Sequence, residues 1–347
     1  MRKIFGMICT VALFGALTVS CTGNKDDEGF NVEYEQYQLK NGLNVILHQD
    51  KSDPIVAMAT IVHVGSNREK PGRTGFAHFF EHMSFNDSEN VPKGANRKMI
   101  PELGGTRNGG TWSDGTIYYE VVPKDAFDKL LWIDSDRLGY MINTVDVGTL
   151  EREKQVVKNE KRQRVDNQPY GLRSERTAEA LYPKGHPYSW STIGYVEDLD
   201  RVNVEDLKAF FKRWYGPNNA VLTIGGDIDI PQTKMWIEKY FGPIPKGPEV
   251  TPADKQPASL NESRYITLED KVHLPLLQLT YPTVYRDHDD EPALDVLANI
   301  LGQGKTSLLY KNMVKNGLAV QAFANHPCKE LACEFVLLSL ANPQNVS

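Results

Sequence analysis

The five residues His78-Phe79-Phe80-Glu81-His82 constrain this chain more than any other segment, because they place two imidazoles and a carboxylate on one side of a helix. At about 100° per helical residue, His82 lies roughly 40° around the axis from His78, and Glu81 lies about 60° away in the other direction. Two neutral ring nitrogens can hold a metal ion while the carboxylate faces a water molecule. The alternative is an ordinary amphipathic helix with polar residues on its outer face.

A zinc site of this kind needs a third protein ligand and an open fourth position. The segment 149–168 is rich in Glu, Lys, Arg and Gln and predicts a helix. Glu153 and Glu160 are seven residues apart, which places them within roughly 20° of each other on one helix face. One carboxylate can bind metal and the other can support the ligands from behind. A solvated helix with charge pairs four residues apart is the alternative interpretation.

The order His-x-x-Glu-His followed by Glu160, with Glu153 seven positions earlier, resembles the pitrilysin, insulysin and mitochondrial processing peptidase family of zinc metallopeptidases. The resemblance extends from about Tyr34 to the last residues of the chain. It implies an α+β fold in which helices pack on a mostly antiparallel sheet. Further segments that resemble the family are 72–77, 83–86, 104–111, 215–222 and 301–310.

This resemblance implies that His78, His82 and Glu160 bind one Zn²⁺ ion and that Glu81 is the general base. Glu153 would support the metal ligands. The implied activity is a zinc endopeptidase that cleaves peptides or unstructured polypeptide segments without a covalent intermediate. Two alternatives remain open. In the first, the chain is a non-catalytic binding subunit. In the second, it is a catalytic half that is inactive until a partner chain supplies a missing C-terminal half.

Residues 104–111 resemble the family's active-site edge strand, to which a peptide substrate can pair through its main chain. The resemblance makes Asn108, Gly109 and Gly110 the candidate substrate-binding residues. From the residues alone, a Gly-rich turn in a half-buried hairpin is the alternative. Alanine often follows the Asn in the family, so we expect the glycine pair to make this edge more flexible.

The N-terminal residues have the form of an export signal. Arg2 and Lys3 precede an apolar run, 4–19, that is too short to span a bilayer as a mature helix. Residues 17–21 resemble a bacterial lipoprotein signal in which Cys21 is acylated and tethers the protein to a membrane. We therefore expect a signal peptide at 1–20, a lipidated flexible tether at 21–33, and an exported lipoprotein facing the periplasm or the cell exterior. A soluble periplasmic form is the alternative.

Charge and cysteine content limit the other possibilities. A net charge of −6 and a pI near 5.8 leave no basic stripe for nucleic acid. Cys328 and Cys333 could form a disulfide in an exported protein or could be buried thiols. They are poor candidates for a second metal site, because the nearby His326 would bring the ligand count only to three.

The order of the predicted elements indicates the domain organisation. Short turns between strands favour antiparallel pairing over a doubly wound sheet. The proline-rich stretch 243–262 predicts a linker between a catalytic zinc-binding domain at 34–242 and an incomplete second repeat of the same fold at 263–347. Strands are expected at 37–48, which a turn at Asn41-Gly42 interrupts, and at 55–64, 118–122, 220–225 and 276–281. Helices are expected at 124–143, 149–168, 204–215, 231–241 and 291–301.

Overall fold

The computed structural model describes residues 31–345. The predicted signal peptide and the acylation site Cys21 lie outside the described residues, so both stay predictions. Residues Tyr34–Ser347 form one compact unit. Within 31–345 no helix combines the length and the apolar character needed to cross a bilayer.

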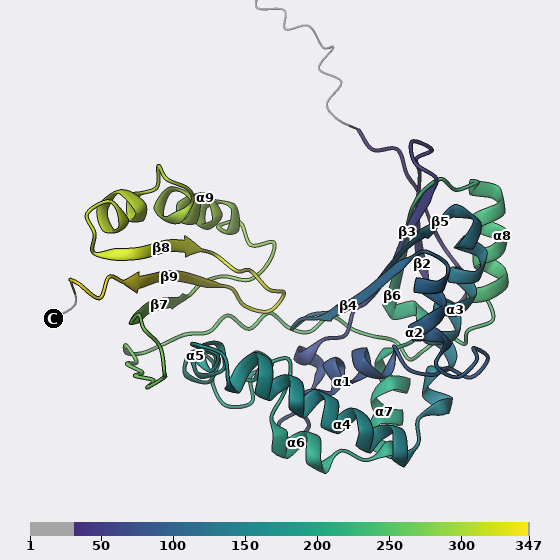
Figure 1. The fold of residues 1–347 in the computed structure, drawn as a ribbon, viewed down its shortest axis with the longest axis horizontal. Helices are drawn as coiled ribbons and strands as arrows, with labels where there is room; N and C mark the ends of the chain where they lie inside the picture. The colour runs from purple at the N-terminus through teal and green to yellow at the C-terminus, as the bar shows by residue number, and fades with distance from the viewer. Residues whose placement is uncertain (1–30, 346–347) are drawn as a thin grey trace, which may run out of the picture. The chain divides into compact units, whose positions relative to one another are not determined.

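A six-stranded sheet organises the first part of the chain, in the spatial order β1-β2-β6-β3-β5-β4 (Figure 1). The pair β2–β6 is parallel and every other neighbouring pair is antiparallel. The expected α+β fold with a mostly antiparallel sheet is therefore confirmed. The strands are β1 (Glu35–Gln38), β2 (Asn44–Gln49), β3 (Ile55–Val62), β4 (Thr106–Thr111), β5 (Thr116–Pro123) and β6 (Ala220–Gly226).

One face of this sheet is covered and the other is more open, as the alternation along its strands predicts. On β3 the side chains of Val56, Met58 and Thr60 are buried, while the intervening residues are exposed or half-buried. Thr60 pairs with Tyr118 on β5, so their buried side chains share a face. Some residues of β4 pair with the buried residues of β5. Their side chains therefore lie on the same face of the sheet, toward the helices.

The helices supply the other half of the core. In Figure 1, α2, α3 and α8 lie along one side of the strands. The contacts that matter for the site are those of α1, which packs against α4, β4 and β5. The helices of this part are α1 (Phe76–Met83), α2 (Ala95–Glu102), α3 (Phe127–Tyr140), α4 (Val147–Lys161), α5 (Arg173–Leu181), α6 (Val196–Arg201), α7 (Val204–Trp214) and α8 (Ile230–Phe241).

A second, smaller sheet has the order β7-β9-β8, and all of its pairs are antiparallel. Its strands are β7 (Leu276–Pro282), β8 (Ala319–Asn325) and β9 (Glu334–Ala341), and helix α9 (Glu291–Gly302) packs mainly on β8. Residues 243–262 contain no helix or strand, as their prolines predict. That this stretch separates two domains, the second an incomplete repeat, stays a prediction.

Every expected helix and strand is present, with differences at the ends. The predicted helix 149–168 is an α-helix only to Lys161, and a π-helical turn, Arg162–Asp166, follows it. Helices α2, α5 and α6 and strands β8 and β9 were not expected. The local sequence patterns of these elements are weak, and α2 even contains Pro101. Their packing on the rest of the chain therefore outweighs local preference.

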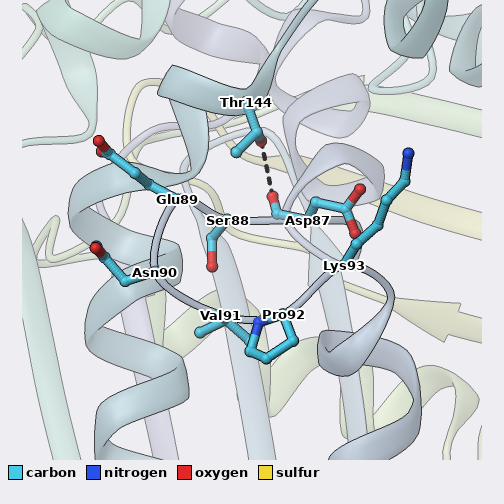
Figure 2. A pocket seen from close by; sticks show the side chains of 8 residues that line it. All are labelled: Asp87, Ser88, Glu89, Asn90, Val91, Pro92, Lys93 and Thr144. Carbon is cyan, nitrogen blue, oxygen red and sulfur yellow. Dashed lines mark hydrogen bonds between the residues drawn. The ribbon is translucent and has the colours of Figure 1, made fainter.

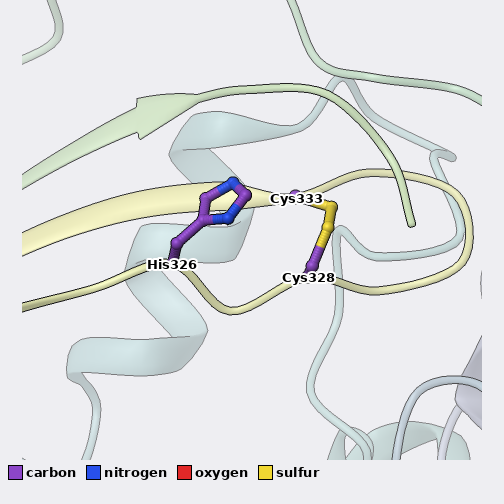
Figure 3. Close-up of side chains that lie close together, drawn as sticks. All are labelled: His326, Cys328 and Cys333. Atoms are coloured by element: carbon purple, nitrogen blue, oxygen red, sulfur yellow. A yellow bond between two sulfur atoms is a disulfide. The ribbon is translucent and has the colours of Figure 1, made fainter. Parts of the chain in front are cut away.

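The two cysteines in the connection between β8 and β9 form a disulfide, Cys328–Cys333, which decides between the two alternatives that the sequence leaves open (Figure 3). The nearby His326 is held by other groups, because its Nδ1 lies 2.9 Å from Asp295 and its Nε2 lies 2.9 Å from the Thr283 hydroxyl. Both sulfurs are bonded to each other, so this cluster does not offer free thiolates to a metal ion.

The disulfide can be checked by peptide mapping, because Lys329 lies between the two cysteines. Trypsin applied without a reductant should yield peptide 316–329 linked to the peptide that begins at Glu330. Treatment with dithiothreitol should separate the two in the mass spectrum. Recovery of both peptides singly, each alkylated at cysteine before reduction, would contradict the pairing.

Candidate active site

Helix α1 carries the histidine motif, and its apolar face fixes the direction in which the motif points. The rings of Phe79 and Phe80 are buried, and Phe80 stacks on Phe210 of α7 with 5.7 Å between ring centroids. The buried rings lie on one face of the helix, so the opposite face, which carries His78, Glu81 and His82, points away from the core. The buried side chains of α1 are those of Phe76, Ala77, Phe79, Phe80 and Met83.

Glu69 holds the beginning of α1. Its two carboxylate oxygens accept hydrogen bonds from the backbone N–H groups of Gly75, at 2.8 Å, and Ala77, at 2.9 Å. Burial raises the pKa of Glu69 to about 8, and these N–H donors oppose that rise. Gly75 has φ of 87°, a left-handed conformation that favours glycine. Glu69 lies outside every local capping pattern, so the sequence offered no signal for its role.

Glu160 meets the two histidines from the last turn of α4. Its Oε2 atom lies 2.8 Å from Nε2 of His82 and 3.7 Å from Nε2 of His78. One ligand atom from each of the three residues lies within 4.8 Å of the other two. The structure thus brings together the three predicted metal ligands from two helices distant in sequence.

The charges of this cluster fit a divalent cation. Burial, together with the neighbouring His82, lowers the pKa of His78 to about 4, so its imidazole is neutral at pH 7. A neutral imidazole is the form that binds metal. A hydrogen bond from His82 lowers the pKa of Glu160, which keeps this carboxyl ionised. Two imidazoles and one carboxylate match the donor set of a catalytic zinc site.

Glu81 lies beside the three predicted ligands, and Thr111 of β4 orients it. The Thr111 hydroxyl donates a hydrogen bond of 2.7 Å to Oε2 of Glu81. Burial raises the pKa of Glu81, and the bond from Thr111 opposes the rise. Sequence reasoning missed Thr111, although alternation along β4 places it on the same face as Gly109. The pocket is lined by His78, Glu81, His82, Phe85, Asn108, Gly109, Gly110, Thr111, Glu160 and Arg164.

Strand β4 ends the sheet beside this pocket and pairs only with β5 among the described strands. The predicted substrate-binding residues Asn108, Gly109 and Gly110 therefore lie on a free strand edge. A Cβ atom at Gly109 would lie 2.8 Å from the Phe85 ring and 3.2 Å from Cγ of Glu81. We expected the glycines to make this edge flexible. The structure gives a different reason for glycine at position 109, because β4 approaches α1 too closely there for a larger side chain.

Glu153 does not join the cluster, although it lies on α4 seven residues before Glu160. Its side chain is buried but does not line the pocket. Its Oε1 atom lies 3.6 Å from Nε of Arg152 and 4.0 Å from Nη2 of Arg97. Support of the metal ligands by Glu153 stays a prediction.

A second hollow, shown in Figure 2, lies in the loop that follows α1. It is closed on one side by Thr144, whose hydroxyl donates a hydrogen bond of 3.0 Å to the backbone carbonyl of Asp87. None of the predicted site residues lines it. Its lining residues are 87–93 and Thr144, which include neither a histidine nor a cysteine.

Two protein-family models match this chain. The model described as insulinase, peptidase family M16, matches residues 44–189, which include every residue of the candidate site. The model described as the peptidase M16 inactive domain matches residues 201–346.

Individual proteins similar to this chain have related descriptions. The zinc protease PqqE of Helicobacter pylori is 30% identical over 346 residues, which are 98% of this chain and 77% of that protein. An uncharacterized zinc protease, YmxG of Bacillus subtilis, is 26% identical over 85% of this chain and 71% of that protein. The beta subunit of the mitochondrial-processing peptidase of Blastocladiella emersonii is 28% identical over 60% of this chain and 44% of that subunit.

Solved structures agree with the fold. A protease from Helicobacter pylori superposes with a TM-score of 0.83 at 29% identity, over 90% of this chain and 76% of that one. Pitrilysin superposes with a TM-score of 0.71 at 22% identity, over 92% of this chain and 35% of its own, which shows a shared fold alone.

Alanine at Gly109 and Gly110 should have different effects. The Gly109→Ala substitution forces the new methyl group against Phe85, so we expect a loss of about 1–3 kcal/mol of unfolding free energy from overpacking. Gly110→Ala is the matched control, since its Cβ would meet only Ile117 Cγ2, at 3.8 Å. Urea unfolding of both variants measures the difference, and equal stabilities would show that β4 does not approach α1 so closely.

Proposed function

We propose that this chain, which belongs to the M16 family of peptidases, is a zinc-dependent endopeptidase. Its proposed substrates are peptides or unstructured polypeptide segments. The family resemblance that the sequence indicated is confirmed by the relative that is 30% identical over 98% of this chain. The observation that carries the proposal is the meeting of His78, His82 and Glu160 in one pocket with Glu81.

His78, His82 and Glu160 would hold the zinc ion. A bound Zn²⁺ supplies Lewis acidity, which activates water and polarises a peptide carbonyl. Within the described residues, the other candidate metal cluster contains the Cys328–Cys333 disulfide and does not compete as a thiolate site. We therefore propose one zinc ion.

Glu81 would move the proton in peptide hydrolysis. Its carboxylate accepts a proton from the attacking water and returns it to the departing amine. The hydrogen bond from Thr111 fixes the orientation of the carboxylate. Burial raises the pKa of Glu81, which makes it a stronger base at neutral pH and a usable acid in the second step.

The free edge of β4 supports an extended polypeptide as substrate. An edge strand presents unpaired N–H and C=O groups to which another chain can add as a further strand. Asn108, Gly109 and Gly110 line the pocket at this edge, beside Glu81. Main-chain pairing needs an extended segment but little from its side chains, which favours unstructured polypeptides over folded domains.

One observation favours a second candidate function, in which the chain needs a partner for activity. Three alternate apolar residues of β7 are largely exposed to solvent. Their exposed fractions are 60% for Leu277, 45% for Leu279 and 51% for Tyr281. A row of this kind is typical of a surface that another chain covers. In this alternative the partner completes the substrate chamber, and the isolated chain binds zinc without turnover.

Replacing Glu81 should separate chemistry from metal binding. We expect Glu81→Gln to lower cleavage of a fluorogenic peptide by about 10²- to 10⁴-fold, because the general base is lost. Zinc content, measured by atomic absorption, should stay the same. Glu160→Gln should lower both zinc content and cleavage, and Glu102→Gln, which changes an exposed glutamate of α2, should alter neither.

The outcomes of this experiment distinguish the candidate functions. A wild-type protein without zinc would contradict the proposal. Zinc without turnover in the wild type, with turnover restored by a second chain, would select the partner-dependent alternative. Equal turnover in wild type and Glu81→Gln would exclude Glu81 as the base.

We also propose that the protein is exported and anchored through acylated Cys21, on the pattern of residues 1–21 alone. Expression with a labelled fatty acid should transfer label to the wild type and not to Cys21→Ser. The wild type should sediment with membranes, because acyl chains supply the attachment. Label on both proteins would contradict acylation at Cys21. Label on neither would contradict the anchor and favour the soluble periplasmic form.

A further inference from the structure

We propose that Arg164 is a positioning residue that makes Glu160 a ligand through one carboxylate oxygen only. This inference rests on the proposed zinc function and concerns how the site stays open to water.

The two oxygens of Glu160 face different groups. Oε2 faces the histidines, at 2.8 Å from His82 and 3.7 Å from His78. Oε1 forms an ion pair with Arg164, whose Nη1 atom lies 2.8 Å away. One oxygen is therefore directed to the metal cluster, and the other is already occupied by a guanidinium.

This division matters because of the number of positions around zinc. A catalytic site has three protein ligands and leaves a further position for water or substrate. If both oxygens of Glu160 turned inward, the carboxylate would occupy a fourth position. A donor on Oε1 opposes that rotation, as partners behind metal ligands do in other zinc sites.

The turn that carries Arg164 is held in place by a buried pair. Lys161, the last residue of α4, donates a hydrogen bond of 2.8 Å to the Glu175 carboxylate of α5, and both side chains are buried. The π-helical turn Arg162–Asp166 follows directly. Arg164 is therefore presented to Glu160 from a fixed backbone, although its own side chain is 77% exposed.

A role in stability alone does not account for Arg164. An exposed pair four residues apart stabilises a helix only weakly. Arg164 also lines the pocket together with all three predicted ligands. Its positive charge repels a cation, so its effect on metal affinity combines charge and orientation, and an experiment has to separate the two.

Two neutral substitutions separate these effects. Arg164→Gln removes the charge and keeps a side-chain N–H donor, whereas Arg164→Met removes both. We expect the zinc affinities of Arg164→Met and Arg164→Gln to differ about tenfold in competition with a chelator, because the two variants differ only in the donor. The same pair at Arg162, which is exposed and does not line the pocket, is the control and should show no difference.

Cobalt substitution supplies a readout that does not depend on turnover. Visible absorption of Co²⁺ is strongest in four-coordinate sites and weakens as ligands are added. The Co²⁺ form of Arg164→Met should lose absorption intensity relative to wild type, and that of Arg164→Gln should not. Thermal unfolding of the metal-free variants checks that each is folded.

The failure of this inference differs from the failure of the proposed function. Equal zinc affinities and equal Co²⁺ spectra for Arg164→Gln and Arg164→Met would overturn the role of Arg164 and leave the zinc function intact. A wild-type protein that binds neither metal would overturn both.

Discussion

The packing of α1 against the helices behind it determines the candidate site. The buried rings of Phe79 and Phe80 leave α1 a single stable orientation, since rotation of the helix would expose them to water. In that orientation the histidines and Glu81 face Glu160 and the edge of β4. The chemistry proposed for this chain therefore depends on apolar residues that never touch a substrate.

The sequence predicted those parts of the site whose geometry is local. Helical periodicity is sufficient to place His78, Glu81 and His82 on one face, and the family resemblance indicated Glu160. Thr111 and Glu69 were not predicted, because they act through hydrogen bonds that depend on the tertiary fold. Glu153 shows the limit of periodicity, since it lies near the helix face of Glu160 without lining the pocket.

The fold was predictable to a similar extent. Alternating strands such as β3 and strongly periodic helices such as α7 have patterns that survive without their neighbours. Short elements such as α6, and strands of the second sheet such as β8, gain their structure mainly from packing. The end of α4 is the most instructive case, because its charged sequence favours helix beyond Lys161 and the chain forms a π-helical turn there instead.

The unpaired margin of β4 has a consequence for the behaviour of the protein in concentrated solution. A strand that accepts polypeptides through its backbone can also accept the same strand of another molecule. Two adjacent glycines, Gly109 and Gly110, reduce this hazard, because they offer no apolar side chains for a dry sheet-to-sheet contact. The segment proposed to pair with a substrate is thus poorly suited to self-assembly.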